Sequence, residues 1–181
     1  MADFNVAIKV VLAHEGGVGT LKGDPGGKTK FGWSTATCKL LKIAQPNTAE
    51  QAIALYLKYF WNPLYSQILN QDVATKLLDD GVNQGTQTGV EHLQAALIHA
   101  GHSVEVDGLF GSATLAAVNQ AVSTIVLEWM RLIQYQSYDR WIKADSVREA
   151  QREGLARRAA WPDQNDVIAK QLLAGTYQPM V

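Results

Sequence analysis

The chain has 181 residues, of which 47% are hydrophobic and 18% charged, and its formal net charge is −1. This size predicts one domain or two small lobes around a substantial core, and the balanced charge gives no reason to expect a nucleic-acid partner. A single cysteine, Cys38, excludes an intramolecular disulfide framework. The N-terminal segment lacks the basic region and A-x-A site of a signal peptide, and no apolar run reaches the roughly 18 residues of a membrane span.

Helical patterns follow one another along almost the whole chain. Asp3 is a candidate N-cap for a first helix that carries one apolar face and stops at Gly16 and Gly17. A glycine-rich loop then continues to about residue 32, with room for a short hairpin. Apolar spacing, caps and breakers predict further helices over residues 34–44, 48–61, 71–85, 89–101, 112–122, 123–144, 146–161 and 163–173.

Three of these helices have recognisable starts. Ser34 and Ser112 are candidate N-caps, and Thr48 followed by Gln51 has the spacing of a capping box. The segment VDGLFG before Ser112 predicts a tight turn that leads into its helix.

Two carboxylates flank the glycine-rich stretch HEGGVGTLKGDPGGKTKFGWS. Glu15 falls in the last turn of the first helix, and Asp24 lies inside the loop. Glycines allow such a loop to fold back, so that both side chains face one cleft. Cleavage of a glycosidic bond uses that arrangement, because one carboxyl protonates the leaving oxygen while an ionised carboxylate acts on water or on the sugar carbon. The same spacing also fits a solvated helix end followed by an ordinary turn.

The local surroundings favour different roles for the two carboxylates. The C-terminal end of a helix is partly negative and disfavours the ionised form of a nearby carboxyl group, which favours Glu15 as the proton donor. Asp24 lies in a polar loop rich in backbone N–H groups and should stay ionised. Carboxylates separated in this way are typical of acid–base pairs.

The same stretch resembles the motif of glycoside hydrolase family 108, the bacterial and phage peptidoglycan muramidases. That motif is E-G-G, a short polar segment, D-x-G-G-x-T, and a glycine beside an aromatic or aliphatic residue. Three more segments are similar to family motifs, the last being typical of the predicted peptidoglycan domain that usually follows: ALYLKYFWNP, LLDDGVNQGTQTGVEHLQAAL and VDGLFGSATLAAV. The chain departs from the family at VGTLKGDP, where Y-x-N-D-P is common, and at Leu155, where the G-W-x-x-R pattern has tryptophan.

The resemblance implies a mainly α, lysozyme-like, two-lobed fold with a small β-hairpin or glycine-rich loop at the active site. It implies a catalytic lobe over residues 1–88 and a helical second lobe over residues 89–181, together one compact unit. It also implies an endolysin-type N-acetylmuramidase that hydrolyses the β-1,4 bond between N-acetylmuramic acid and N-acetylglucosamine and lyses cells.

The order of residues is also similar to phage-type lysozymes. Carried over, Glu15 is the general acid, Asp24 activates water and Thr29 positions that water, with inversion at the sugar carbon. Thr29 follows Asp24 by one residue fewer than in those enzymes. Trp33, Asn83 and Gln84 are candidate substrate-binding residues, although core packing for the tryptophan and helix capping for the amides explain them too.

Metal and cofactor chemistry find no support in the sequence. An H-E-x-x-H zinc motif would need a histidine where Val18 stands, and His92, His99 and His102 have no completing ligand nearby. We expect no cofactor, no metal, and a monomer whose partner is peptidoglycan. The basic segment REAQREGLARRAAW fits either a solvated helix face or a weak contact with an anionic outer membrane.

Two other functions remain open at this stage. A lytic transglycosylase would need only Glu15, and a non-catalytic peptidoglycan-binding module would need neither carboxylate. For the enzyme, the missing signal peptide predicts synthesis in the cytoplasm and action in the periplasm after release, through a holin in a phage, with a bacterial muramidase as the other setting.

Overall fold

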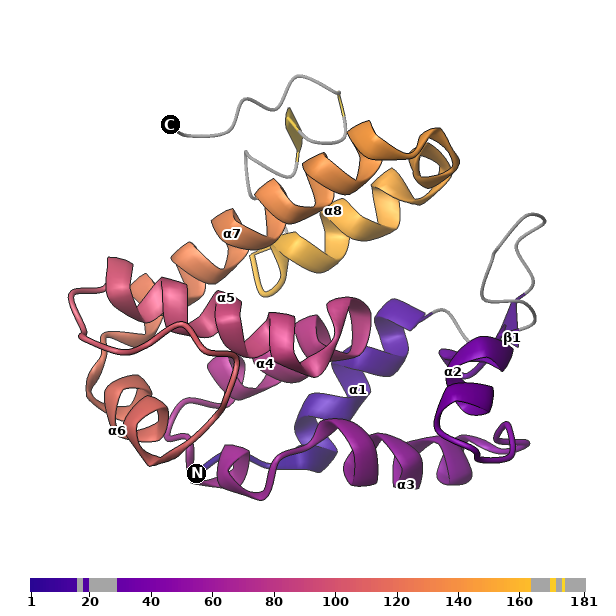
Figure 1. Ribbon diagram of the computed structural model, residues 1–181, viewed down its shortest axis with the longest axis horizontal. Helices are drawn as coiled ribbons and strands as arrows, with labels where there is room; N and C mark the ends of the chain where they lie inside the picture. The colour runs from indigo at the N-terminus through magenta and orange to yellow at the C-terminus, as the bar shows by residue number, and fades with distance from the viewer. Residues whose placement is uncertain (16–17, 20–28, 164–169, 172–173, 175–181) are drawn as a thin grey trace.

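A computed structural model gives the arrangement of the chain, which is dominated by helices (Figure 1). The structure describes residues 1–15, 18–19, 29–163, 170–171 and 174. Its α-helices are α1 Phe4–Glu15, α2 Thr35–Leu40, α3 Ala49–Phe60, α4 Gln71–Gln84, α5 Thr86–His99, α6 Ser112–Gln120, α7 Ser123–Ala144 and α8 Arg152–Ala160. Two 3₁₀ helices, η1 Pro63–Gln67 and η2 Ser146–Gln151, complete the helical part. The mainly α, lysozyme-like fold is therefore confirmed.

The first helix forms as its sequence predicts. Asp3 Oδ1 accepts a hydrogen bond from the Asn5 backbone N–H at 2.7 Å, which satisfies one of the free donors at the start of α1. Its apolar face, including Ile8 and Val11, is buried against α4. This packing fixes the direction of α1 and therefore the position of Glu15, its last residue.

A small antiparallel sheet lies beyond the end of α1. Its strands, in spatial order, are β1 Val18–Gly19, β2 Thr29–Lys30 and β3 Trp33–Ser34. Phe31 and Gly32 form the turn between β2 and β3 with φ values of 51° and 80°. Thr29 lies opposite Ser34 in this hairpin. The short hairpin expected within the glycine-rich stretch is thus present.

Helix starts confirm two of the three predicted caps. Ser34 Oγ accepts from the Thr37 N–H at 3.0 Å, and Thr48 Oγ1 accepts from the Gln51 N–H at 3.3 Å. The third prediction is wrong, because Gly111 is the N-cap of α6 and Ser112 is already its first residue. A glycine there makes no side-chain hydrogen bond, so the turn before it, rather than a hydroxyl, starts the helix.

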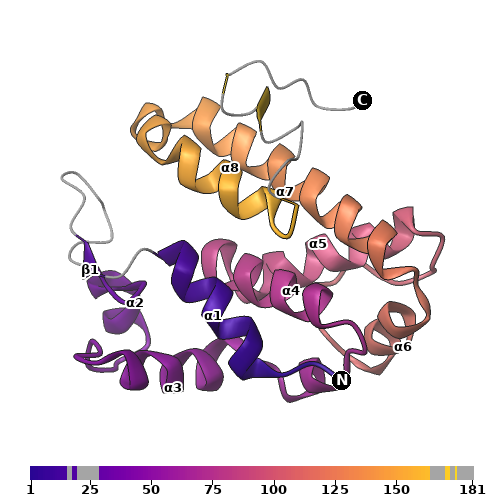
Figure 2. The ribbon, with the colours of Figure 1, turned by 180° about the vertical axis from the view of Figure 1, so that it is seen from behind.

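The central helix is α4, which contacts α1, α3, α5 and α7. The hairpin of α7 and α8 lies across it, as the views from both sides show (Figures 1 and 2). One large apolar core extends from Ala2 to Met130, and a second, smaller core joins the end of α7 to α8. Helix α8 therefore rests on its own apolar cluster and faces α4 with polar groups.

The C-terminal region differs from its predicted form. Residues 146–161 form η2 followed by α8 rather than one continuous helix. Most of the helix predicted over residues 163–173 lies outside the described residues. Within the described part of the chain, no helix is long and apolar enough to cross a membrane.

Candidate active site

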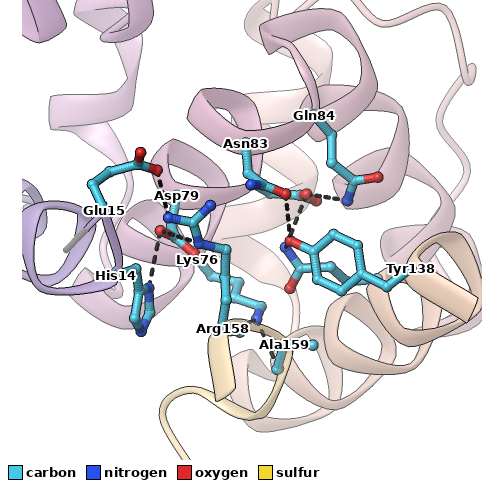
Figure 3. Close-up of polar contacts among 11 residues, drawn as sticks. His14, Glu15, Lys76, Asp79, Asn83, Gln84, Tyr138, Arg158 and Ala159 are labelled. Carbon is cyan, nitrogen blue, oxygen red and sulfur yellow. Dashed lines mark hydrogen bonds and ion pairs between the residues drawn. The ribbon is translucent and has the colours of Figure 1, made fainter. Parts of the chain in front are cut away.

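Glu15 is held at the end of α1 by two different neighbours. On one side lies the hairpin turn, where a Cβ atom built on Gly32 would approach Glu15 Oε2 to 2.8 Å and would also collide with the Tyr56 hydroxyl. On the other side, Arg158 Nη2 donates to Glu15 Oε1 at 2.6 Å (Figure 3). The Glu15 side chain is 16% exposed, so it is enclosed but still accessible.

Arg158 binds a second carboxylate at the same time. Its Nε lies 3.3 Å from Asp79 Oδ1, and its side chain is only 6% exposed. Burial penalises the charged guanidinium, but the negative charges of Asp79 and Glu15 outweigh that penalty and raise the pKa of Arg158 above its ordinary value. Arg158 is therefore a buried cation shared by Glu15 and Asp79.

Asp79 joins this pair back to the first helix. His14 Nδ1 lies 3.1 Å from Asp79 Oδ1, and the Asp79 side chain is 1% exposed. Asp79 Oδ2 has no hydrogen-bond partner among the residues that the structure describes. His14 is the residue next to Glu15, so the contacts His14–Asp79–Arg158–Glu15 form a closed ring that links α1, α4 and α8 (Figure 3).

Lys76 fixes the helix that carries Arg158. Its ammonium donates to the backbone oxygens of Arg158 at 2.9 Å and Ala159 at 2.8 Å, and the side chain is fully buried. Carbonyls in the last turn of a helix lack intrahelical donors, so Lys76 satisfies two of them. Burial lowers the pKa of Lys76 to about 8, although the charges of Asp79 and Asp80 act in the opposite direction.

Aromatic residues form an apolar support under the hairpin. The Tyr56 hydroxyl donates to the Phe31 backbone oxygen at 3.0 Å, and burial, followed by the charge of Glu15, raises the pKa of Tyr56. The Trp33 ring is 5.0 Å from Tyr56 and 5.6 Å from Phe60, between ring centroids. Trp33 is 1% exposed, so the structure places this candidate sugar-stacking residue in the core beneath the hairpin.

The other predicted site residues are placed as follows. Asp24 lies outside the described residues, and Thr29 is half-buried on β2. Asn83 and Gln84 end α4, where Asn83 Oδ1 accepts from the Tyr138 hydroxyl at 2.8 Å. Asn83 is four residues after Asp79 and therefore on the same helix face (Figure 3). Both amides are half-buried and already take part in hydrogen bonds with α7.

A buried polar cluster continues from this face toward α5. Asp80 accepts from Gln84 at 2.7 Å and from Gln134 at 3.0 Å, and its second oxygen lies 2.7 Å from His92 Nδ1. His99 instead stacks on Trp129, with ring centroids 4.0 Å apart. Among the described residues, no group of three or more His, Cys, Asp or Glu side chains is arranged to hold a metal ion.

The arginines of the C-terminal segment are paired rather than free. Each lies within ion-pair distance of a carboxylate, and the pairs are Arg148–Asp145, Arg152–Glu149, Arg157–Glu153 and Arg158–Glu15.

The sequence interpretation missed Arg158, Asp79 and Lys76 as part of the site. A local signal for the arginine exists, because Leu155, Ala156 and Ala159 are buried and Arg158 falls on the same stripe of α8. Its neighbour Arg157 is exposed and pairs with Glu153. Helical position, rather than charge, distinguishes the two arginines.

A separate cavity of about 540 Å³ lies away from this ring, between the end of α3 and the start of α5. Tyr59, Trp61, Asn62 and Gln87 are among its lining residues, together with the turn at Gly108. Gln94 holds that turn by accepting from the Gly108 N–H at 2.9 Å.

Comparisons with known proteins agree with this geometry. Residues 8–85 match the family model described as Glycosyl hydrolase 108, and residues 88–160 match the model described as Predicted Peptidoglycan domain. The chain therefore contains a glycoside hydrolase family 108 domain followed by a predicted peptidoglycan domain. The two matches together support a family 108 glycoside hydrolase that acts on peptidoglycan.

The fold of the chain is similar to a solved structure, described as the structure of Brucella abortus SagA. The TM-score is 0.67 at 23% sequence identity, and the match covers 97% of this chain and 96% of that chain. At this identity the likeness shows the fold. No curated protein matches the chain. Glu15 lies in the region matched as glycosyl hydrolase and Arg158 in the region matched as peptidoglycan domain, so the site is made by both.

Proposed function

We propose that this protein is an N-acetylmuramidase that hydrolyses the β-1,4 bond between N-acetylmuramic acid and N-acetylglucosamine. The observation that carries the proposal is the enclosure of Glu15 between the Gly32 turn and Arg158, at the end of a helix whose apolar face is buried. An enclosed carboxyl group that is still accessible suits a general acid, because fixed neighbours orient it and little water competes for its proton.

The proposed reaction needs two proton movements. Glu15 in its protonated form donates its proton to the glycosidic oxygen while the bond from that oxygen to the sugar carbon breaks. Water attacks the sugar carbon from the opposite face, Asp24 takes the proton of that water, and Thr29 helps to position it. The family resemblance supports these roles for Asp24 and Thr29, and this order of events inverts the anomeric configuration.

The experiment uses purified peptidoglycan free of outer membrane. Wild type, Glu15→Gln and Asp24→Asn are compared by loss of turbidity and by mass analysis of the released fragments. We expect wild type to release fragments with reducing N-acetylmuramic ends, and Glu15→Gln to lose at least about 100-fold in rate. Asp24→Asn should also be strongly impaired.

Two other results would each replace the proposal. Anhydro ends, with Asp24 dispensable, would identify a lytic transglycosylase. Sedimentation with the wall without any release of fragments would identify a binding module, for which the aromatic cavity between α3 and α5 is the candidate surface.

We further propose the biological setting of an endolysin, which is released to the periplasm through a holin and lyses the cell there. Inducible expression in a Gram-negative host tests this, with and without a co-expressed holin. Lysis only with the holin supports the endolysin setting, whereas periplasmic accumulation without it supports a bacterial muramidase with its own export route.

A further inference from the structure

Arg158 is shared between two carboxylates that differ in what they can do. It reaches Glu15 through Nη2 at 2.6 Å and Asp79 through Nε at 3.3 Å. The planar guanidinium suits this double contact because it presents several donors in a fixed geometry. Glu15 is partly accessible, whereas Asp79 is almost completely buried at 1% exposure. Only the first of the two can therefore exchange a proton directly with a bound substrate.

Asp79 has the capacity to hold Arg158 alone. Its Oδ1 atom already accepts the Arg158 Nε contact and faces His14, while Oδ2 has no hydrogen-bond partner within the described residues. A carboxylate can bind a guanidinium through both oxygens. The buried cation thus keeps a counter-ion when Glu15 becomes neutral.

The backbone of Arg158 cannot follow Glu15. Lys76 binds the backbone oxygens of Arg158 and Ala159, and Leu155 and Ala156 are buried in the small core shared with α7. Movement is left to the side chain, over the short distance between its two carboxylate partners.

We propose that Arg158 is a positioning residue that works as an exchangeable counter-ion: it pairs with Glu15 while that carboxylate is ionised and passes to Asp79 when Glu15 carries the proton to be donated. This inference rests on the proposed muramidase function and extends it. It makes α8, from the region matched as peptidoglycan domain, part of the catalytic apparatus.

The exchange predicts that two substitutions act in opposite directions on the pH dependence of hydrolysis. Six ionisable groups of the described residues face Glu15 or the groups paired with it, namely Arg158, Asp79, His14, Tyr56, Lys76 and Tyr138. Losing the cation in Arg158→Gln favours the protonated Glu15, so the alkaline limb of the rate profile moves to higher pH. Losing the alternative anion in Asp79→Asn ties Arg158 to Glu15, so that limb moves to lower pH.

The experiment measures rate against pH on soluble peptidoglycan fragments for wild type, Arg158→Gln, Asp79→Asn and Arg158→Lys. We expect opposite shifts of roughly one pH unit for the first two variants. Arg158→Lys should fold but lose about 10- to 100-fold in kcat with little change in KM, because an ammonium cannot bridge both carboxylates and Arg158 does not touch the substrate.

Arg157→Gln is the matched control, since Arg157 is the adjacent residue and is exposed. Its profile should equal that of wild type. The inference is overturned if the variants are folded, as judged by circular dichroism, and keep the wild-type alkaline limb and kcat. It is also overturned if the alkaline limbs of Arg158→Gln and Asp79→Asn shift in the same direction. A wild type that releases no fragments, or an active Glu15→Gln, would instead reject the muramidase proposal. If Arg158→Gln does not fold, the shift in Asp79→Asn and the kcat of Arg158→Lys decide.

Discussion

Glu15 is supported from two sides that use different physical means. The side of the hairpin is apolar, with Trp33 and Tyr56 packed under the Gly32 turn. The side of α8 is charged, with Arg158 and Lys76 buried among carboxylates and carbonyls. Packing holds a side chain at any pH, whereas buried charges respond to protonation. The comparison indicates that the hairpin confines the Glu15 side chain sterically, whereas α8 supplies its counter-ion.

The largest effect is expected from Trp33→Ala. Removing a fully buried indole from the aromatic support should lower the free energy of unfolding by about 3–5 kcal/mol, measured by urea denaturation. Trp33→Phe is the control, because it keeps most of the ring packing. If Trp33→Phe is stable but raises KM for glycan fragments several-fold, the ring contacts substrate, and its placement in the core is not its whole role.

A smaller loss is expected from Gly32→Ala. At φ 80° a side chain is strained, and the new Cβ would collide with the Tyr56 hydroxyl and Glu15. We expect a loss of about 1–3 kcal/mol in unfolding free energy, together with a larger loss of activity than of stability. Gly154→Ala is the matched control, since a Cβ there meets nothing within 4 Å. Unchanged activity of Gly32→Ala would show that the turn does not set the position of Glu15.

Lys76 tests the charged side through the pH dependence of stability. Its pKa is about 8 in the folded protein and 10.5 as a free side chain, so the unfolded chain binds more protons between these values. The free energy of unfolding of wild type should therefore rise with pH relative to Lys76→Met. The expected gain between pH 7.5 and pH 10 is about 2–3 kcal/mol. Lys143→Met, on the exposed side of α7, should show no such difference. A flat comparison would mean that burial of Lys76 does not alter its titration.

The smallest effect is expected from Thr48→Ala, at the start of α3. Loss of the cap should cost about 1 kcal/mol in unfolding free energy, read from denaturation curves, and leave kcat unchanged. Thr48→Ser keeps the hydroxyl and should be neutral. A fall in kcat for Thr48→Ala would show that the apolar side depends on the exact position of α3.

The apolar side was largely predictable and the charged side was not. Residues close in the sequence determine the caps at Ser34 and Thr48 and the end of α1, so local patterns were sufficient. The pairing of Glu15 with Arg158 joins residues 143 positions apart, and although the apolar stripe of α8 marks Arg158 as buried, no local rule identifies Glu15 as its partner. The start of α6 was misplaced by one residue because a serine after glycine has the composition of a cap without its geometry.

The burial of Lys76, Asp79 and Asp80 could not be predicted from local sequence patterns either. They lie within a stretch that has the appearance of a charged helix surface, yet all three are buried. The positions of α5, α7 and α8 over α4 make burial of these charges acceptable, through the partners that those helices supply.

The packing of α8 over α4 limits how this chain and its relatives can be combined in chimeras. Chimeras that take the first region from one relative and the second from another would exchange Arg158 without the carboxylates of Glu15 and Asp79 that it binds. A functional hybrid must therefore transfer α4 and α8 as a matched pair, even though 67 residues separate Gln84 from Arg152. Residues 8–85 and 88–160 match separate family models, but one region cannot be exchanged without the other.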